Sequence, residues 1–121
     1  MTLAQARSHT DEMCRAFNAR NLEALMDLFN PKIVGHGGSS KWGLDLIRNW
    51  YPATWKSFSD VHLKQEVIQA AEDWYASRYC LSGTNDGLFL GKASTGKRFE
   101  AWGLVVVRVQ DGKIVEYWDA F

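Results

Sequence analysis

The sequence predicts an α+β fold in which three N-terminal helices pack on a strongly curved, mainly antiparallel sheet. Two observations support this prediction. Apolar residues recur with helical spacing in the first part of the chain. The rest has strand patterns separated by turn sequences such as Asp111-Gly112. Helices followed by antiparallel strands are typical of α+β proteins, and a long sheet curved around three helices would form a cone with an apolar interior.

Two helices are predicted in the first 30 residues. The first follows from one apolar stripe, because its apolar residues lie three or four positions apart or at multiples of these spacings. Asn21 is a good N-cap for a second, short helix, and Pro31 is expected to end it. The apolar positions of the two helices are Leu3, Ala6, Met13, Ala16, Phe17, Leu22, Leu25, Met26, Leu28 and Phe29.

A short strand, a turn and the third helix are predicted next. Lys32–Gly35 is expected to be a strand, and Gly35–Ser40 a mobile turn because it is rich in glycine. The third helix follows Gly43, with Pro52 near its end. Its apolar residues, which we expect to face the interior, are Leu44, Ile47, Trp50 and Tyr51.

The second half of the chain is predicted to be strand. Four segments of turn-forming residues separate the strands: Glu72-Asp73, Gly83–Gly87, Thr95–Lys97 and Asp111-Gly112. The expected strands are Val61–Ala71, Trp74–Ser82, Leu88–Leu90, Phe99–Gln110 and Lys113–Phe121.

The last two strands are apolar on both faces. Side chains alternate between the two faces of a strand, so Trp102, Leu104 and Val106 share the face opposite Val105 and Val107. Three helices can cover only one face, and we therefore expect a homodimer through the other. In the last strand, Val115, Tyr117, Asp119 and Phe121 are expected on one face, and Ile114, Glu116, Trp118 and Ala120 on the other.

Composition excludes several classes of protein. The 121 residues fit one domain, residues 1–121. Fourteen basic residues balance fourteen acidic ones, which argues against a nucleic-acid or membrane partner. The chain has no apolar run of transmembrane length and no recognisable secretory signal. Cys14 and Cys80 lie in no metal or redox motif, and no nucleotide-binding motif is present. We therefore expect a cytoplasmic protein with reduced cysteines and no bound metal.

Two stretches carry a family resemblance. Gly83–Lys97 has the pattern GT-x-x-G-x-F-x-G-x-x-x-TGK, and Arg108–Asp119 has R-x-x-DGKI-x-E-x-W-D. Together with AFNARNLEALMDLF, VGHGG and SFSDVHL, they resemble the SnoaL-like polyketide cyclases (ester cyclases) of the nuclear transport factor 2-like superfamily. The resemblance covers nearly the whole chain. It implies a cone-shaped α+β barrel, usually dimeric, with a deep apolar pocket. It also implies an enzyme that closes a polyketide ring by an intramolecular aldol step, without a cofactor.

Asp119 is the first candidate catalytic residue. The resemblance implies that an aspartate at this position of the last strand is the general acid/base. The residues agree, because a carboxylate on an apolar face has a raised pKa, as a base acting near neutral pH requires. The alternative is a solvated carboxylate near the end of the chain. The sequence departs from the family in two places: Val105 stands where a histidine is common, and Asn85 replaces the histidine of a G-T-H segment.

A working cyclase would then need another donor for the enolate oxygen. Tyr117 is our first choice because it lies two residues before Asp119 on the same face. His36, in GHGG at the mouth of the pocket, and Asn85, in the GTNDG segment, are the other candidates.

The predicted ligand is a small apolar or aromatic, polyketide-like molecule. Six tryptophans are many for a chain of this length, and aromatic residues can form either the walls of a pocket or a core. Arg78 would hold a ligand oxygen or, more simply, pair with Glu100 or Glu116. The residues expected to bind substrate are Phe17, Trp50, Trp55, Arg78, Asn85 and Val105. Two other functions stay open: a non-catalytic domain that binds a small molecule, and a dimerising scaffold whose interior is filled.

Overall fold

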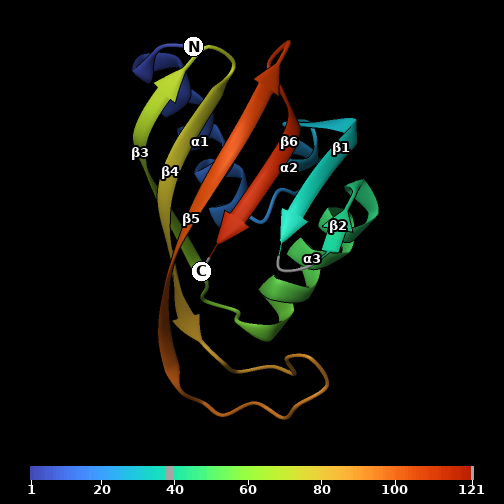
Figure 1. Cartoon of the computed structure of the whole chain (residues 1–121). Coiled ribbons are helices and arrows are strands. Elements are labelled where there is room, and N and C mark those ends of the chain that lie inside the picture. The colour runs from blue at the N-terminus through green and yellow to red at the C-terminus, as the bar shows by residue number, and fades with distance from the viewer. Residues whose placement is uncertain (38–39, 121) are drawn as a thin grey trace.

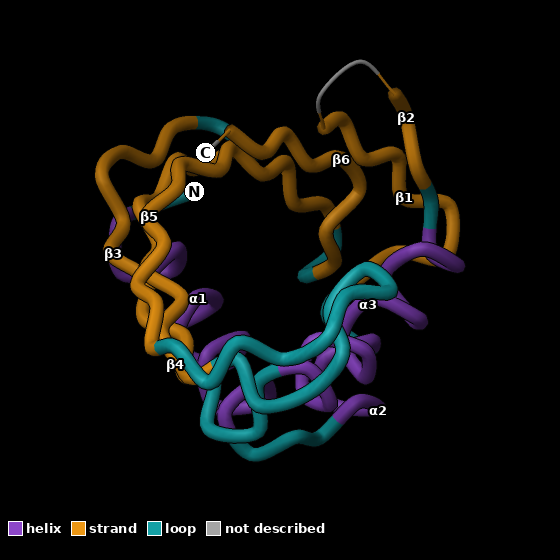
Figure 2. Tube along the Cα trace, turned by 90° about the horizontal axis from the view of Figure 1, so that it is seen from below, coloured by secondary structure: helices purple, strands orange, loops and turns teal. Residues whose placement is uncertain are grey.

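The computed structural model describes residues 1–37 and 40–120, which form three helices and six strands (Figure 1). Seen along the axis, the strands curve around one side of the molecule, and the helices with the long β4–β5 connection close the other side (Figure 2). The predicted α+β class is confirmed. In chain order the elements are α1 (Leu3–Asn18), α2 (Leu22–Met26), β1 (Phe29–Gly37), β2 (Ser40–Trp42), α3 (Leu44–Ser57), β3 (His62–Ala71), β4 (Trp74–Thr84), β5 (Arg98–Gln110) and β6 (Lys113–Ala120).

The sheet is mixed, with the strand order β2-β1-β6-β5-β4-β3. Four of the pairings are antiparallel, and β1 pairs with β6 in parallel. No helix in the described part of the chain is long and apolar enough to cross a membrane.

The first helix forms where the apolar stripe predicts it. Thr2 caps its N-terminus in a reciprocal arrangement with Gln5, which satisfies two backbone N–H groups that the helix itself leaves unpaired. Ala6, Met13 and Phe17 are buried against the sheet, as expected, whereas Leu3 is exposed. α3 buries Ile47 but leaves Trp50 half exposed, so the prediction that Trp50 faces the interior is wrong.

The structure corrects two predicted boundaries. α2 ends at Met26 and not at Pro31, because the carbonyl of Leu28 accepts a hydrogen bond from the Ile114 N–H at 2.8 Å and so draws the chain into the sheet. Pro31 lies in an irregular stretch of β1, where its missing N–H breaks no ladder hydrogen bond. Leu88–Leu90 is not a strand; it belongs to the loop between β4 and β5, with a single isolated bridge between Phe89 and Lys92.

Other expectations fall partly outside the described residues. The predicted turn Gly35–Ser40 includes residues 38–39, and the residues described around them belong to β1 and β2. Phe121 also lies outside the described residues, so its predicted place on the same face as Asp119 is not described.

A β-bulge changes the predicted faces of β6. Val109 pairs with Ile114, whereas the preceding Arg108 pairs with Glu116, so Val115 is an extra residue in the strand. The bulge turns Ile114 to the interior, where it is completely buried. Beyond the bulge the alternation holds as predicted, with Tyr117 on the inner face.

A buried histidine connects α1 to the sheet. His9 is 8% exposed, and its Nδ1 lies 2.8 Å from the Tyr75 hydroxyl. Its Nε2 is buried and has no hydrogen-bond partner among the described residues. Burial lowers the pKa of His9 below its usual 6.5.

This burial predicts a stability that depends on pH. Below about pH 6.5 His9 is protonated in the unfolded chain but stays neutral in the folded chain, because its pKa is lowered there. The free energy of unfolding is therefore highest above this pH and decreases as the pH falls towards the lowered pKa. Replacing His9 with phenylalanine should flatten this decline, whereas the exposed His62→Gln should keep the wild-type slope. Melting temperatures measured from pH 8 to pH 5 test the expectation, and equal slopes in all three proteins would contradict it.

Candidate active site

Asp119 lies on the inner face of β6, between Val105 of β5 and Gly37 of β1. The hydroxyl of Tyr79, on β4, donates a hydrogen bond to Asp119 Oδ1 at 3.0 Å. Burial raises the pKa of the Asp119 carboxyl, and the hydrogen bonds from Tyr79 and from the backbone of Ala120 partly oppose the rise. The site therefore contains a carboxyl group whose pKa is shifted towards neutrality, next to a hydroxyl donor.

Two more tyrosines lie near this carboxyl group. Tyr51 of α3 and Tyr117 of β6 are partly buried against the core. Loss of water raises the pKa of Tyr51, Tyr79 and Tyr117, and the negative charge of Asp119 raises each of them further. All three phenols are therefore protonated at neutral pH and can donate hydrogen bonds.

Aromatic rings continue the inner surface away from Asp119. Tyr51 stacks with Trp55 at a ring distance of 6.2 Å and meets Phe17 edge-on at 5.8 Å. On the other side, the Trp42 ring lies over Gly35 and packs against Tyr117 at 5.5 Å. Phe17 and Trp55, both predicted to bind substrate, are thus part of the aromatic cluster around Tyr51.

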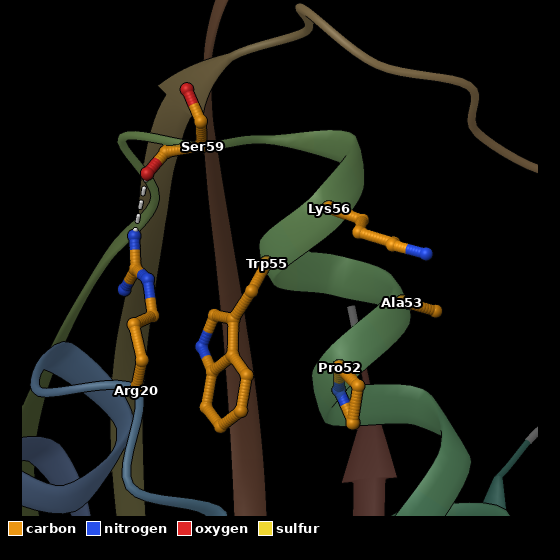
Figure 3. A pocket seen from close by; sticks show the side chains of 6 residues that line it. All are labelled: Arg20, Pro52, Ala53, Trp55, Lys56 and Ser59. Carbon is orange, nitrogen blue, oxygen red and sulfur yellow. Dashed lines mark hydrogen bonds between the residues drawn. The ribbon is translucent and has the colours of Figure 1, made fainter.

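An open groove of about 560 Å³ lies next to Trp55 (Figure 3). Arg20, Pro52 and Lys56 contribute to its lining, and Arg20 donates a hydrogen bond to the Ser59 carbonyl at 2.9 Å. Trp55 also stacks with Tyr51, and its Nε1 is buried without a partner in the described part of the chain. Trp55 thus belongs both to the lining of the groove and to the aromatic cluster.

His36 lies away from Asp119. Its Nε2 is 2.8 Å from Glu116 Oε2, and its ring stacks on Trp118 at 5.3 Å. Glu116 and Trp118 occupy the outer face of β6, opposite Asp119, so the structure does not bring His36 to the carboxyl group as the sequence analysis expected.

Arg78 also lies on the outer face. It forms an ion pair with Glu66 at 3.6 Å, and its guanidinium lies 4.5 Å from the centre of the Trp102 ring. The prediction that Arg78 pairs with Glu100 or Glu116 is wrong, because the antiparallel pairing of β3 and β4 places Glu66 directly opposite Arg78.

Asn85 and Trp50, both predicted to bind substrate, lie outside the Asp119 site. Asn85 Oδ1 accepts a hydrogen bond from the Thr95 N–H at 2.8 Å, and its Nδ2 donates to the Gly87 carbonyl at 3.1 Å. These bonds close the base of the β4–β5 loop and occupy the amide that the sequence analysis assigned to substrate. Trp50 lines a second groove, of about 550 Å³, with Leu88 and other residues of α3 and that loop.

Val105 lies where the sequence analysis places it. It is 2% exposed, pairs with Asp119 across the β5–β6 ladder, and brings an apolar surface and no donor. Among residues 1–37 and 40–120, no three histidine, cysteine, aspartate or glutamate side chains gather closely enough to hold a metal ion.

Sequence reasoning overlooked Tyr79 and Tyr51 as site residues. Tyr79 is separated from Asp119 by a whole strand, so no local pattern connects the two. One feature that points to Tyr79 is the glycine opposite it: Tyr79 pairs with Gly103 across the β4–β5 ladder. Because Gly103 has no side chain, a long side chain at position 79 can extend across the sheet. Tyr51 was expected to face inward, but its proximity to Asp119 depends on the packing of α3.

The curved sheet carries a carboxyl group and phenol donors on its inner face, a set of groups suited to acid/base chemistry. Neither of the two grooves described above is lined by Asp119. The family model described as SnoaL-like polyketide cyclase matches residues 8–121, and the chain belongs to this family. The resemblance found in the sequence is thereby confirmed.

Named relatives agree with this assignment. Aklanonic acid methyl ester cyclase AcmA of Streptomyces galilaeus is 28% identical over 111 residues, which are 88% of this chain and 77% of AcmA. The structure of AclR, proposed to be a hydroxylase of the same organism, superposes with a TM-score of 0.88 at 28% identity, over 98% of this chain and 76% of AclR. IdmH, a proposed polyketide cyclase of Streptomyces antibioticus, gives 0.79 at 28% identity, over 93% and 88% of the two chains.

Proposed function

We propose that this chain is a cyclase that acts without a cofactor on an enolisable, polycyclic ketone held in the aromatic interior. The observation that carries the proposal is the 3.0 Å hydrogen bond between Tyr79 and Asp119, inside a partly buried cluster of aromatic rings. A carboxylate with a raised pKa is a competent base near neutral pH, and tyrosine hydroxyls are suitable donors for a developing enolate oxygen.

The proposed reaction is an intramolecular aldol addition. The Asp119 carboxylate takes a proton from the carbon beside one carbonyl group, and the resulting enolate carbon attacks a second carbonyl carbon of the same molecule. A carbon–carbon bond forms, and the second carbonyl oxygen becomes an alkoxide. Asp119 returns its proton to that alkoxide, so the product has the mass of the substrate. Tyr117 donates a hydrogen bond to the enolate oxygen, or Tyr79 does so once Asp119 has taken the proton, because until then the single O–H of Tyr79 is donated to Asp119.

The proposed substrate site extends from Asp119 along the aromatic cluster. In this proposal Val105 forms an apolar floor beside Asp119, and Tyr51 and Trp55, which pack on the buried Phe17, provide the rings that face a planar ligand. The main contribution of such a site to the rate is proximity, because it holds the two reacting carbons of one molecule close together, whereas in solution the flexible substrate is rarely in the reactive conformation.

Conversion of aklanonic acid methyl ester, the compound in the name of the relative AcmA, tests this function. We expect the wild-type chain to produce an isomer of unchanged mass and different retention time in liquid chromatography with mass spectrometry. Binding of this and related polycyclic ketones without conversion of any of them would contradict the enzyme proposal and favour a non-catalytic binding domain.

A homodimer through the outer face of the sheet is also proposed. Trp102 and Leu104 are 50% and 51% exposed on neighbouring positions of β5, and Val106 continues the patch. Large apolar patches of this kind are typical of interfaces, and a two-fold dimer would cover the same patch on both copies.

Charge placed in this patch should separate the dimer. We expect sedimentation at tens of micromolar to give twice the mass of the chain for wild type and the single-chain mass for Trp102→Glu/Leu104→Glu. Leu90→Glu, at an exposed apolar position of the β4–β5 loop, is the matched control and should remain dimeric. A monomeric wild-type protein would refute the proposed interface.

A further inference from the structure

Gly103 lies directly beneath the ring of Tyr79. The two residues are partners in the β4–β5 ladder. A methyl group at Gly103 would lie 2.4 Å from Cζ and 2.5 Å from the hydroxyl oxygen of Tyr79, distances at which one of the groups must move. The Tyr79 ring therefore rests on the backbone of β5, in the space that a side chain would occupy.

This arrangement explains how Tyr79 reaches Asp119. Tyr79 belongs to β4 and Asp119 to β6, with β5 between them. Neighbouring strands are about 4.8 Å apart, so the two outer strands are roughly 10 Å apart. A tyrosine spans that gap only if its side chain lies flat across the middle strand, and a residue with a side chain at position 103 would block this path.

A second tyrosine of β4 provides an internal comparison. Tyr75 is on the same face as Tyr79 and pairs with Val107, whose side chain is buried there. The Tyr75 hydroxyl does not cross β5; it contacts His9 of α1 at 2.8 Å. The side chains of these two tyrosines, on one face of one strand, therefore point in different directions. Tyr75, which does not cross β5, has Val107 opposite it, and Tyr79, which does, has Gly103 opposite it.

We propose that Gly103 is a positioning residue, whose missing side chain lays Tyr79 across β5 and so directs its hydroxyl to Asp119. The catalytic meaning of this role rests on the proposed function, in which Asp119 is the base. The geometric claim can be tested in the free protein, without a substrate.

The test is a carboxyl-carbon NMR titration of Asp119 in four proteins: wild type, Tyr79→Phe, Gly103→Ala and the double variant. The hydrogen bond from Tyr79 holds the pKa of Asp119 down, and its loss should raise that pKa. We expect Gly103→Ala to give the same rise as Tyr79→Phe, and the double variant to give no further rise, because both changes remove one interaction. An unchanged pKa in folded Gly103→Ala, or in Tyr79→Phe, would overturn the proposal.

Two further variants separate positioning from loss of stability. Val109→Ala removes a buried side chain from the same strand and should lower the melting temperature without raising the pKa of Asp119. If Gly103→Ala fails to fold, Gly103→Ala/Tyr79→Ala should fold, because no ring then occupies the space of the new methyl group. Failure of this double variant, with Tyr79→Ala itself folded, would show that the methyl group clashes elsewhere and would refute the proposal.

The outcome is independent of the proposed reaction. If the titrations behave as expected but no polycyclic ketone is converted, the positioning role of Gly103 stands and the proposed cyclase function fails.

Discussion

Asp119→Asn is expected to reduce turnover by about a hundredfold to ten-thousandfold, the range in which a general base contributes. Asparagine has nearly the shape of aspartate, and its amide oxygen can still accept the hydrogen bond from Tyr79. It cannot take a proton from carbon. Steady-state conversion of a polycyclic ketone measures the loss, and a wild-type rate would exclude Asp119 as the base.

Stability measurements distinguish this loss from misfolding. The raised pKa of Asp119 means that the fold disfavours its charged form. Removing that charge should therefore leave the melting temperature at neutral pH equal to or above the wild-type value. Asp11→Asn, on the exposed side of α1, is the control and should retain full turnover.

Tyr79→Phe is expected to reduce turnover by about a hundredfold, the typical cost of removing one donor to a developing oxyanion. The change should also move the acidic limb of the pH–rate profile to higher pH. Activity requires the Asp119 carboxylate, and loss of the Tyr79 hydrogen bond raises the pKa below which that carboxylate is protonated. The profile of the logarithm of kcat/KM against pH provides both numbers.

The same measurement on Tyr117→Phe identifies the donor. The sequence favours Tyr117 because it is two residues from Asp119, whereas in the structure the Tyr79 hydroxyl is 3.0 Å from the Asp119 carboxyl group and would be released to the enolate oxygen when Asp119 takes the proton. A larger loss in Tyr117→Phe, with an unmoved pH profile in Tyr79→Phe, would assign the enolate oxygen to Tyr117 and contradict our preference.

Local patterns in the sequence predicted much of the sheet. The Asp111-Gly112 turn predicts the β5–β6 hairpin, and the family resemblance places Val105 opposite Asp119, as observed. Regular pairing counted from the turn would instead put Trp118 opposite Val105, and the β-bulge at Val115 shifts the register by one residue. The alternation fails only at Ile114, because a β-bulge at Val115 shifts the faces and a bulge leaves no clear mark in a run of apolar residues.

Residues whose partners come from distant strands could not be placed in this way. His36 was assigned to the mouth of the pocket because the family it resembles often has a histidine there, but the parallel pairing of β1 with β6 puts it next to Trp118 on the outer face. Arg78 has its partner Glu66 on β3, and Tyr79 reaches Asp119 across a third strand. Each contact depends on strand order and register, which a single sequence does not specify.

Solvent deuterium exchange into a bound polycyclic ketone shows whether Asp119 is the base. A base that removes the proton beside the carbonyl group exposes that position to exchange even when ring closure is slow. In deuterated buffer, wild-type protein should introduce deuterium at this carbon much faster than buffer alone, and Asp119→Asn should match the buffer. Equal exchange by wild type and Asp119→Asn would show that Asp119 is not the base.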